Sequence, residues 1–207
     1  MKKIALIGYS GHALVVAELI IETGYTIIGY LEKEEVKSNP LKIPYLGFER
    51  DENLLEKIKN ILVFPAIGDN TIRSESMMFM KSRGFTIPKV ISFEANISAT
   101  AMINDGTLVV RGACINTYAL IGRGVIINTA AVIDHECQIG DFVHIAPGAV
   151  ILGNVKIGEG TFVGANAIVK QGVKIGDFSV IGAGSVVLED VPNKSTYVGN
   201  PARLKNG

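Results

Sequence analysis

Three histidines carry the clearest potential for acid–base chemistry in this sequence: His12, His135 and His144. Histidine is the side chain whose charge changes near neutral pH, which suits it to accept a proton from a nucleophile. Glu136 follows His135 directly, so its carboxylate can hold one ring nitrogen as a donor and raise the basicity of the other. Asp134, on the other side, is a second candidate for that assistance. The alternative interpretation is that His135 is an ordinary surface histidine beside acidic residues.

The sequence predicts neither a metal site nor a thiol nucleophile. The three histidines lack the spacing of metal ligands. Cys114 and Cys137 form no CxxC motif and offer no disulfide framework. In the repeat described below, Cys137 falls at a small inward position, and Cys114 faces outward without an activating neighbour.

Two short segments have the composition of phosphate-binding turns. Residues 8–13 read Gly-Tyr-Ser-Gly-His-Ala and lie between a predicted strand and a predicted helix, where backbone N–H groups can hold a phosphate. Residues 68–70, Gly-Asp-Asn, follow another predicted strand and therefore reach the same edge of the sheet. The first segment is not GxGxxG, so an NAD-binding enzyme is a weak interpretation that would need detectable NAD binding.

Strands and helices alternate in the first 90 residues, which predicts a small, parallel, Rossmann-like α/β sheet. Apolar runs predict strands at 3–7, 26–31 and 61–67. Helical spacing of apolar residues predicts helices at 13–23, 51–59 and 71–84, with Gly24 and Gly84 at the ends of the first and the last.

From residue 91 the pattern changes to an uninterrupted repeat of six. Every sixth residue from Ile91 to Val187 is Ile or Val, seventeen in all, and no residue at the fifth position is larger than Val. This pattern is typical of a parallel β-helix, in which one large and one small side chain point into a narrow prism. We therefore expect an α/β domain at 1–90, a β-helix at 91–192 and a tail at 193–207.

Three hexads make one coil, so residues 18 apart should stack on neighbouring coils, about 4.8 Å apart. Gly153 should lie directly above His135, which faces outward from the third position of its hexad. The N–H of Gly153 could stabilise an oxyanion, or this glycine could be an ordinary turn residue. Ala165 and Ala183 should stack as a smooth wall. His144 ends its hexad, which we expect to place it at a corner near His135.

The composition excludes several classes of partner. The 207-residue chain has 20 Lys plus Arg and 20 Asp plus Glu, so its formal net charge is zero. Nucleic-acid binding and adhesion to an anionic membrane both need an excess of cations. No apolar run reaches the ~18 residues of a membrane span, and no signal-peptide cleavage site follows residues 1–8, so we expect a cytoplasmic protein.

Residues 8–12 (GYSGH), 68–73 (GDNTIR) and 128–137 (NTAAVIDHEC) occur in this order, and the tail contains VGNPAR. Together with the hexads they resemble bacterial nucleotide-sugar acetyltransferases: the bacillosamine-pathway and perosamine N-acetyltransferases and the related sialic acid O-acetyltransferases. The resemblance covers nearly the whole chain. It implies a left-handed β-helix and a homotrimer with active sites between adjacent β-helices. Acetyl-CoA would lie along the β-helix, and the α/β domain would hold a nucleotide sugar.

The resemblance also implies roles for individual residues. His135 would be the general base that deprotonates the acceptor, with support from Glu136. The expected contacts to acetyl-CoA are His144, Gly153, Ala165 and Ala183. The expected contacts to the nucleotide sugar are Ser10, Gly11, His12, Gly68, Asp69 and Asn70.

One pair of residues departs from the family pattern. The family usually has two acidic residues at the end of the second strand, where this chain has Glu32 and Lys33. Glu32 can still accept hydrogen bonds from the nucleotide, but Lys33 cannot replace an acid. Recognition of the base or the ribose is therefore expected to differ.

We interpret the chain as an acetyl-CoA-dependent N-acetyltransferase that acts on a nucleotide-linked amino sugar, in the first instance a UDP-4-amino-4,6-dideoxy sugar, without a metal or an acyl-enzyme. O-acetylation of a sialic acid or another sugar is the nearest alternative, because one base serves both nucleophiles. A non-catalytic β-helix that binds nucleotide sugars is a third interpretation, against which the pair of His135 and Glu136 argues.

Overall fold

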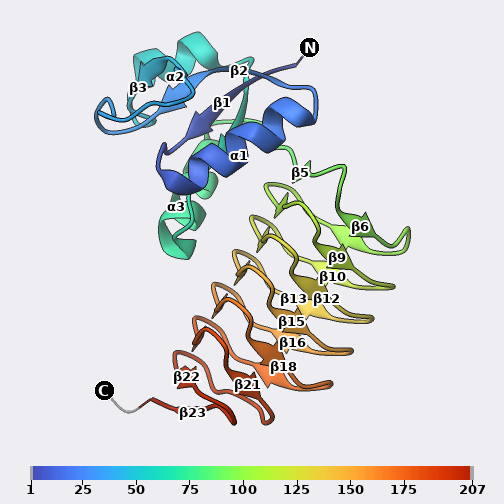
Figure 1. Cartoon of the computed structure of the whole chain (residues 1–207). Helices are drawn as coiled ribbons and strands as arrows, with labels where there is room; N and C mark the ends of the chain where they lie inside the picture. The colour runs from blue at the N-terminus through green and yellow to red at the C-terminus, as the bar shows by residue number, and fades with distance from the viewer. Residues whose placement is uncertain (1, 206–207) are drawn as a thin grey trace. The chain divides into compact units, whose positions relative to one another are not determined.

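A computed structural model describes residues 2–205 of the chain. The chain divides into two compact units, Met1–Val90 and Ile91–Gly207, which are described separately below. Figure 1 shows the helices and the longer strands in the first unit and the repeated short strands in the second.

The first unit is built on a parallel four-stranded sheet with the order β3-β2-β1-β4. The strands are β1 (Lys3–Ile7), β2 (Thr26–Leu31), β3 (Tyr45–Gly47) and β4 (Leu62–Pro65). The helices are α1 (Gly11–Glu22), α2 (Glu52–Ile58) and α3 (Asn70–Ser82). The predicted parallel α/β sheet is thus confirmed, with β3 as the one strand in it that the apolar pattern did not predict.

The helices of this unit begin and end where the sequence provides the right residues. Asp51 and Asp69 cap α2 and α3 with their side chains. Gly24 follows α1 with a φ of +85°, and its N–H donates to the Ile21 carbonyl at 3.0 Å. Because the sheet is parallel, the loops that follow β1, β2, β3 and β4 all reach its carboxyl edge.

The second unit contains seventeen two-residue strands, β5–β21, followed by β22 and β23 in the tail. The strands are β5 (Val90–Ile91), β6 (Asn96–Ile97), β7 (Met102–Ile103), β8 (Leu108–Val109), β9 (Cys114–Ile115), β10 (Leu120–Ile121), β11 (Ile126–Ile127), β12 (Val132–Ile133), β13 (Gln138–Ile139), β14 (His144–Ile145), β15 (Val150–Ile151), β16 (Lys156–Ile157), β17 (Phe162–Val163), β18 (Ile168–Val169), β19 (Lys174–Ile175), β20 (Val180–Ile181), β21 (Val186–Val187), β22 (Thr196–Val198) and β23 (Arg203–Leu204). Each of the seventeen ends at the Ile or Val that opens a hexad, so the period of six is the spacing of strands.

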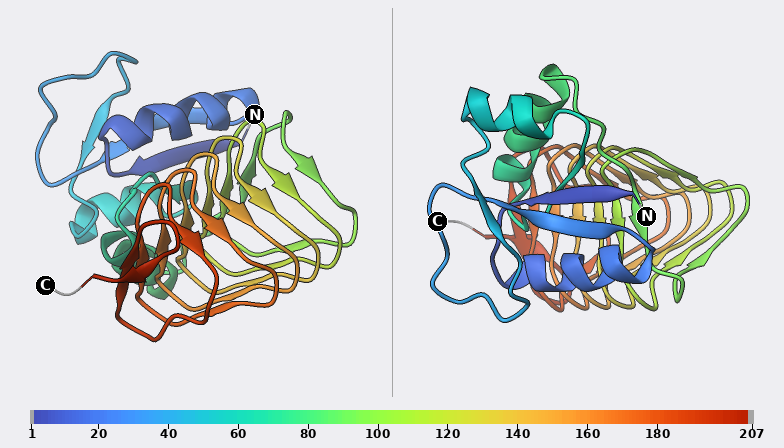
Figure 2. Two further views of the ribbon diagram at one scale, coloured as in Figure 1. Left: turned by 60° about the horizontal axis from the view of Figure 1, so that its bottom comes forward. Right: turned by 90° about the horizontal axis from the view of Figure 1, so that it is seen from above.

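These strands form three sheets that wrap one core. The five-stranded sheet has the order β19-β16-β13-β10-β7, the six-stranded sheet β21-β18-β15-β12-β9-β6, and the eight-stranded sheet β23-β22-β20-β17-β14-β11-β8-β5. Paired residues within β6–β21 are 18 apart, as in Ile133 and Ile151, which confirms the predicted coil of three hexads. Figure 2 shows the successive coils stacked along the unit.

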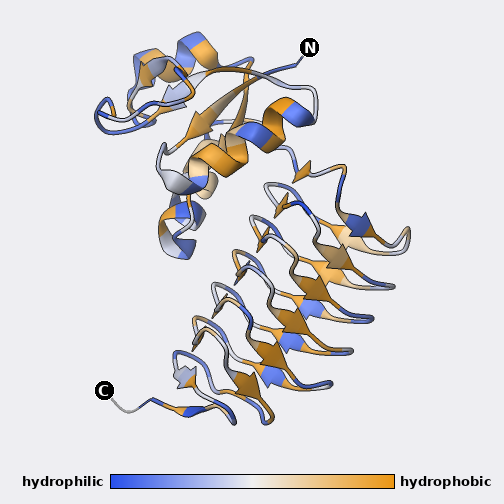
Figure 3. Ribbon diagram, viewed as in Figure 1, coloured by the Kyte–Doolittle hydropathy of each residue, from blue (hydrophilic) through white to orange (hydrophobic). Residues whose placement is uncertain are grey.

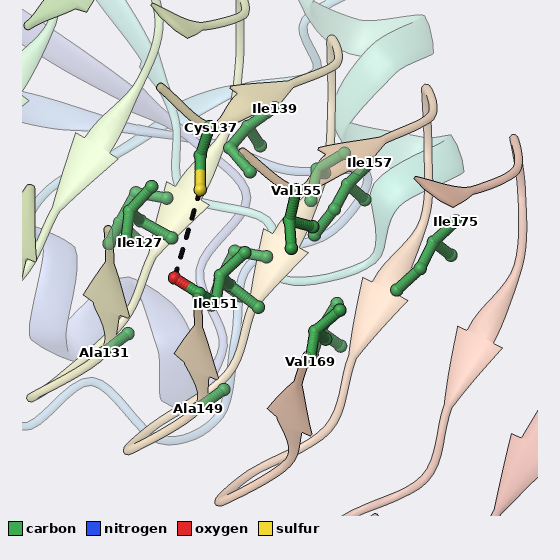
Figure 4. Close-up of a cluster of buried hydrophobic side chains, with 14 of the residues drawn as sticks. Ile127, Ala131, Cys137, Ile139, Ala149, Ile151, Val155, Ile157, Val169 and Ile175 are labelled. Carbon is green, nitrogen blue, oxygen red and sulfur yellow. Dashed lines mark hydrogen bonds between the residues drawn. The ribbon is translucent and has the colours of Figure 1, made fainter. Parts of the chain in front are cut away.

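The core of this unit is a column of aliphatic side chains. Figure 4 shows Ile139, Ile157 and Ile175 on successive coils, and the smaller Ala131 and Ala149 belong to the same buried cluster. Cys137 is fully buried in this column, and burial raises the pKa of its thiol, which confirms its predicted place as a core residue. Stacking of this kind buries a continuous core although no single coil could do so alone.

Within the described residues, 2–205, none of the helices combines the length and the apolar character that crossing a membrane requires.

Candidate active site

His135 lies in the turn between β12 and β13 and faces outward as predicted, with 47% of its side chain exposed. Glu136 has a left-handed φ of +59°, which turns the chain sharply and brings its carboxylate beside the preceding ring. The distance between His135 Nδ1 and Glu136 Oε2 is 3.1 Å. In this arrangement Nδ1–H donates to the carboxylate, and Nε2 remains the acceptor nitrogen of the ring.

Gly153 lies one coil above His135, which confirms the predicted stacking. A Cβ atom at position 153 would lie 2.5 Å from His135 Nε2, so the imidazole occupies the space that a side chain would need. The Asn154 N–H donates to the His135 carbonyl at 2.8 Å and fixes the register of the two turns. The ring therefore rests on the bare backbone of the next coil.

Asp134 does not assist the imidazole in the way that Glu136 does. Its Oδ1 accepts the backbone N–H of His135 at 2.8 Å and Nδ2 of Asn116, one coil below, at 3.0 Å. These donors, the His135 N–H foremost, lower the pKa of Asp134, and the Gly153 N–H contributes in the same direction. The role of the Gly153 N–H toward an oxyanion stays a prediction.

His144 lies in strand β14 of the eight-stranded sheet, and its predicted corner position is wrong. The last residue of each hexad pairs in the ladder with its equivalents 18 residues away, here Ile126 and Phe162. His144 is 9% exposed, and its imidazole packs edge-on against the Phe162 ring, with centroids 5.1 Å apart. Its Nε2 lies 3.2 Å from Nδ2 of Asn128.

Ala165 and Ala183 occupy the turns that follow β17 and β20, and they are stacked as predicted. The Gly184 N–H donates to the Ala165 carbonyl at 2.8 Å, and Asn166 makes the equivalent bond to Pro147 one coil below. Small side chains thus line one edge of the prism over three coils.

In the first unit, two cavities open at the carboxyl edge of the sheet, and they share Tyr9 and Ser10. One, of about 210 Å³, is lined by Ile7, Gly8, Tyr9, Ser10, Glu32, Glu49, Ala66, Ile67, Ile72 and Ser76. The other, of about 330 Å³, is lined by Tyr9, Ser10, Gly11, Leu14, Val36, Ser38 and Pro40. The loop after β1 therefore takes part in both, and Glu32 lines the first together with the loop after β4.

The comparisons with known proteins agree with both units. Residues 3–78 match the model of the PglD N-terminal domain, and residues 154–189 match the bacterial transferase hexapeptide model (six repeats). A mutant of perosamine N-acetyltransferase from Caulobacter crescentus, solved with CoA and GDP-perosamine, is 32% identical with a TM-score of 0.95. The alignment covers 100% of this chain and 98% of that one.

A second solved relative is the acetyltransferase domain of PglB from Neisseria gonorrhoeae FA1090, in complex with acetyl coenzyme A. It is 35% identical with a TM-score of 0.92, and 99% of each chain is covered. The chain belongs to the left-handed β-helix sugar N-acetyltransferases.

Two further residues line the cavities of this sugar N-acetyltransferase: Tyr9, which lies within the predicted phosphate-binding turn but was not itself a predicted contact, and Glu49, which has no signal in the sequence. Tyr9 stacks on Tyr30 with ring centroids 4.5 Å apart, and its hydroxyl donates to Asn39 Oδ1 at 2.8 Å. Glu49 faces the same cavity as Glu32, and burial, reinforced by the charge of Glu32, raises its pKa. Glu49 follows β3, a three-residue strand that has no apolar run to reveal it.

Lys33, the residue that departs from the family's paired acids, is exposed, and its backbone N–H donates to Glu32 Oε1 at 3.0 Å. The second carboxylate of this cavity therefore comes from Glu49 on a different segment. Glu32 thus shares its cavity with a second acidic residue, although the two acids are not adjacent in the sequence.

The loop after β4 is held from within by a buried arginine. Arg73, 1% exposed, donates to the Gly68 carbonyl at 3.0 Å and to Asn70 Oδ1 at 2.8 Å, while Asp69 caps α3 through the Ile72 N–H. The side chains of Asp69 and Asn70 thus shape the loop.

His12, in the first turn of α1, is mostly buried, and burial followed by the charge of Arg73 lowers its pKa to about 4. It is therefore neutral at physiological pH and adds no positive charge to the predicted phosphate site. No group of three or more His, Cys, Asp or Glu side chains within residues 2–205 is arranged to hold a metal ion.

Proposed function

We propose that His135 is the general base of an acetyl transfer to the amino group of a nucleotide-linked amino sugar. The enzyme is an acetyl-CoA-dependent sugar N-acetyltransferase, as its family membership establishes. The observation that carries the role of His135 is its geometry: an outward imidazole with Nδ1 bound to Glu136 and Nε2 over the bare backbone of Gly153.

The proposed reaction needs no covalent enzyme intermediate. The acceptor amine attacks the thioester carbonyl, a C–N bond forms, and Nε2 of His135 takes the amine proton. Glu136 keeps Nδ1–H as a donor and stabilises the imidazolium that results. Collapse of the tetrahedral species breaks the C–S bond, and the proton passes from His135 to the departing thiolate of CoA.

The stacked small residues support a place for the acetyl-CoA substrate. Pro147, Ala165 and Ala183 leave a smooth edge that a pantetheine arm could follow, and the absence of a side chain at Gly153 lets the imidazole rest on the backbone of the next coil. We propose that His144 contacts acetyl-CoA. Its bond to Asn128 would fix the orientation of the imidazole.

The two cavities at the sheet edge support a nucleotide site in the first unit. Ser10 precedes α1 without capping it, and the first turn of α1 carries no acidic residue, so its N–H groups suit a diphosphate. Glu32 follows β2, where an acidic residue accepts ribose hydroxyls in Rossmann-like folds. We propose a UDP-4-amino-4,6-dideoxy sugar as the acceptor. A GDP-linked amino sugar is the second candidate, because the Caulobacter relative was solved with GDP-perosamine.

The outer face of the six-stranded sheet supports assembly into a homotrimer. Its outward residues from β12 to β21 are Val132, Val150, Ile168 and Val186, all apolar. Figure 3 shows these strands in the orange of hydrophobic residues. The five-stranded sheet, by contrast, presents Lys156 and Lys174. An apolar strip of this length favours contact with another copy of the chain.

The experiment is a panel assay of acetyl transfer to UDP-linked and GDP-linked amino sugars and to sialic acid. We expect turnover with an amino sugar, and His135→Ala should lower kcat at least about a hundredfold while acetyl-CoA still binds. Gln171→Ala, two coils above His135 in the same column, is the matched control. Absence of turnover with every amino sugar would refute the proposed acceptor, and unchanged kcat in His135→Ala would refute the base.

A further inference from the structure

Two hydrogen-bond donors meet at one carboxylate oxygen beside the imidazole of His135. The His135 N–H and the Asn116 side-chain amide both donate to Asp134 Oδ1, at 2.8 and 3.0 Å. Asp134 thus links its own turn to the coil of Asn116 below it.

We infer that Asp134, held by Asn116, is a positioning residue that fixes the turn carrying His135 against Gly153. This inference rests on the proposed function, in which His135 is the base. Asp134 acts on the backbone before the imidazole, whereas Glu136 acts on the ring itself. Asp134 therefore places the ring, and Glu136 determines which ring nitrogen carries the proton.

The pattern around Asp134 differs from that around two other turn aspartates of this repeat, Asp141 and Asp177. Asp141 and Asp177 accept the backbone N–H of the residue 18 positions earlier, Arg123 and Glu159, at 2.7 and 2.9 Å. Those bonds join one coil to the next. Asp134 instead accepts the N–H of its own neighbour and takes the contact to the lower coil from a side chain.

The exposure of the imidazole explains why the turn that carries His135 needs to be fixed. The ring is about half exposed in the single chain. Displacement of a catalytic group by about 1 Å can lower a rate by about a hundredfold. A fixed turn therefore matters more here than it would for a base buried in a packed core.

The inference predicts a graded series. Asp134→Ala should lower kcat by about tenfold to a hundredfold and leave the KM for acetyl-CoA within about twofold. Asp134→Asn should recover kcat to within about threefold of the wild type, because an amide oxygen can still accept the two donors at Oδ1. Asn116→Ala should give a smaller loss than Asp134→Ala. Asp177→Asn, which changes an acid at another corner, should leave kcat unchanged.

Nitrogen NMR of the His135 imidazole in the unliganded protein supplies a readout that a purely structural role would not move. The wild type should show a single tautomer with Nδ1 protonated, and Asp134→Ala should show exchange between tautomers as the ring leaves Glu136. If Asp134→Ala does not fold, Asn116→Ala carries the same test, because it removes one donor to the carboxylate and leaves the turn residues intact.

Wild-type kcat and a wild-type tautomer signal in Asp134→Ala or Asn116→Ala would overturn the inference. So would equal losses in Asp134→Ala and Asp177→Asn, which would indicate a general effect on the repeat. If the wild-type enzyme acetylates no amino sugar, the proposed function fails, and the NMR signal of the unliganded protein still decides the role of Asp134.

Discussion

The imidazole of His135 lies against the backbone of Gly153, in the space that a side chain at position 153 would occupy. A methyl group at position 153 would have to displace the ring, because its carbon would lie 2.5 Å from Nε2. The ring is the far end of a half-exposed side chain, so its displacement should cost little stability. Displacement of the ring should instead lower the rate of catalysis.

We therefore predict that Gly153→Ala lowers kcat by about a hundredfold, while the free energy of unfolding changes by less than about 1 kcal/mol. Steady-state kinetics and urea unfolding measure the two effects. Gln171→Ala, in the same column one coil above Gly153, should change neither. Retention of wild-type kcat in Gly153→Ala would mean that the ring does not need its observed place.

At the scale of the element, α1 carries a histidine whose protonation opposes folding. In the folded chain the pKa of His12 is about 4, against the ordinary value of 6.5. Below pH 6.5 the unfolded chain binds a proton that the folded chain does not, so stability is lost as the pH falls from 6.5 toward 4 and levels off below. The loss should be about 2 kcal/mol between pH 7 and pH 5.

Hydrogen exchange of the α1 amides at both pH values measures this loss locally. His12→Gln should reduce the difference to a few tenths of a kcal/mol, because the amide does not titrate. His135→Gln, which alters an exposed histidine, should retain the full difference. A wild-type protein whose α1 amides are equally protected at pH 7 and pH 5 would contradict the prediction.

The repeating elements could be read from the sequence because each hexad encodes one strand and one turn. The column that contains Gly153 and His135 followed from the period of 18 alone, and so did the stacking of Ala165 on Ala183. His144 was misplaced because a period does not show which of its six positions pair in the ladder. The contact between Glu136 and the ring was predicted from their adjacency, but the left-handed φ of Glu136 that makes the contact possible has no signal in the sequence.

The first unit was less predictable where contacts are long-range. Its strands and helices followed from apolar spacing, but β3 is a short strand of half-buried residues, so the approach of Glu49 to Glu32 had no local signal. The hydrogen bonds from Arg73 to Gly68 and Asn70 could not be predicted either, because nothing in the sequence distinguishes a buried arginine from an exposed one in a helix.

At the scale of the whole molecule, the three sheets of the prism differ in what they present to solvent. The six-stranded sheet presents an unbroken apolar strip over the four coils from Val132 to Val186, with Ile168 39% exposed. Charged side chains cover the later coils of the five-stranded sheet instead. An assembly of identical chains gains most by burying the apolar strip, because apolar area removed from water contributes about 25 cal/mol per Å².

Ile168→Glu should therefore convert the proposed trimer into single chains without unfolding them. The new carboxylate is exposed in one chain, where it costs little, but it would be buried without a partner in the assembly, at about 3–5 kcal/mol for each copy. Size-exclusion chromatography with light scattering at micromolar concentration should give the mass of one chain.

Lys156→Glu, a change of charge on the five-stranded sheet, should keep the mass of three. A trimer that survives Ile168→Glu would place its interface on another face of the prism, and a wild-type monomer would remove the trimer altogether. Because the proposed active sites lie between adjacent copies, Ile168→Glu should also lose acetyl transfer, although its turn at His135 remains intact.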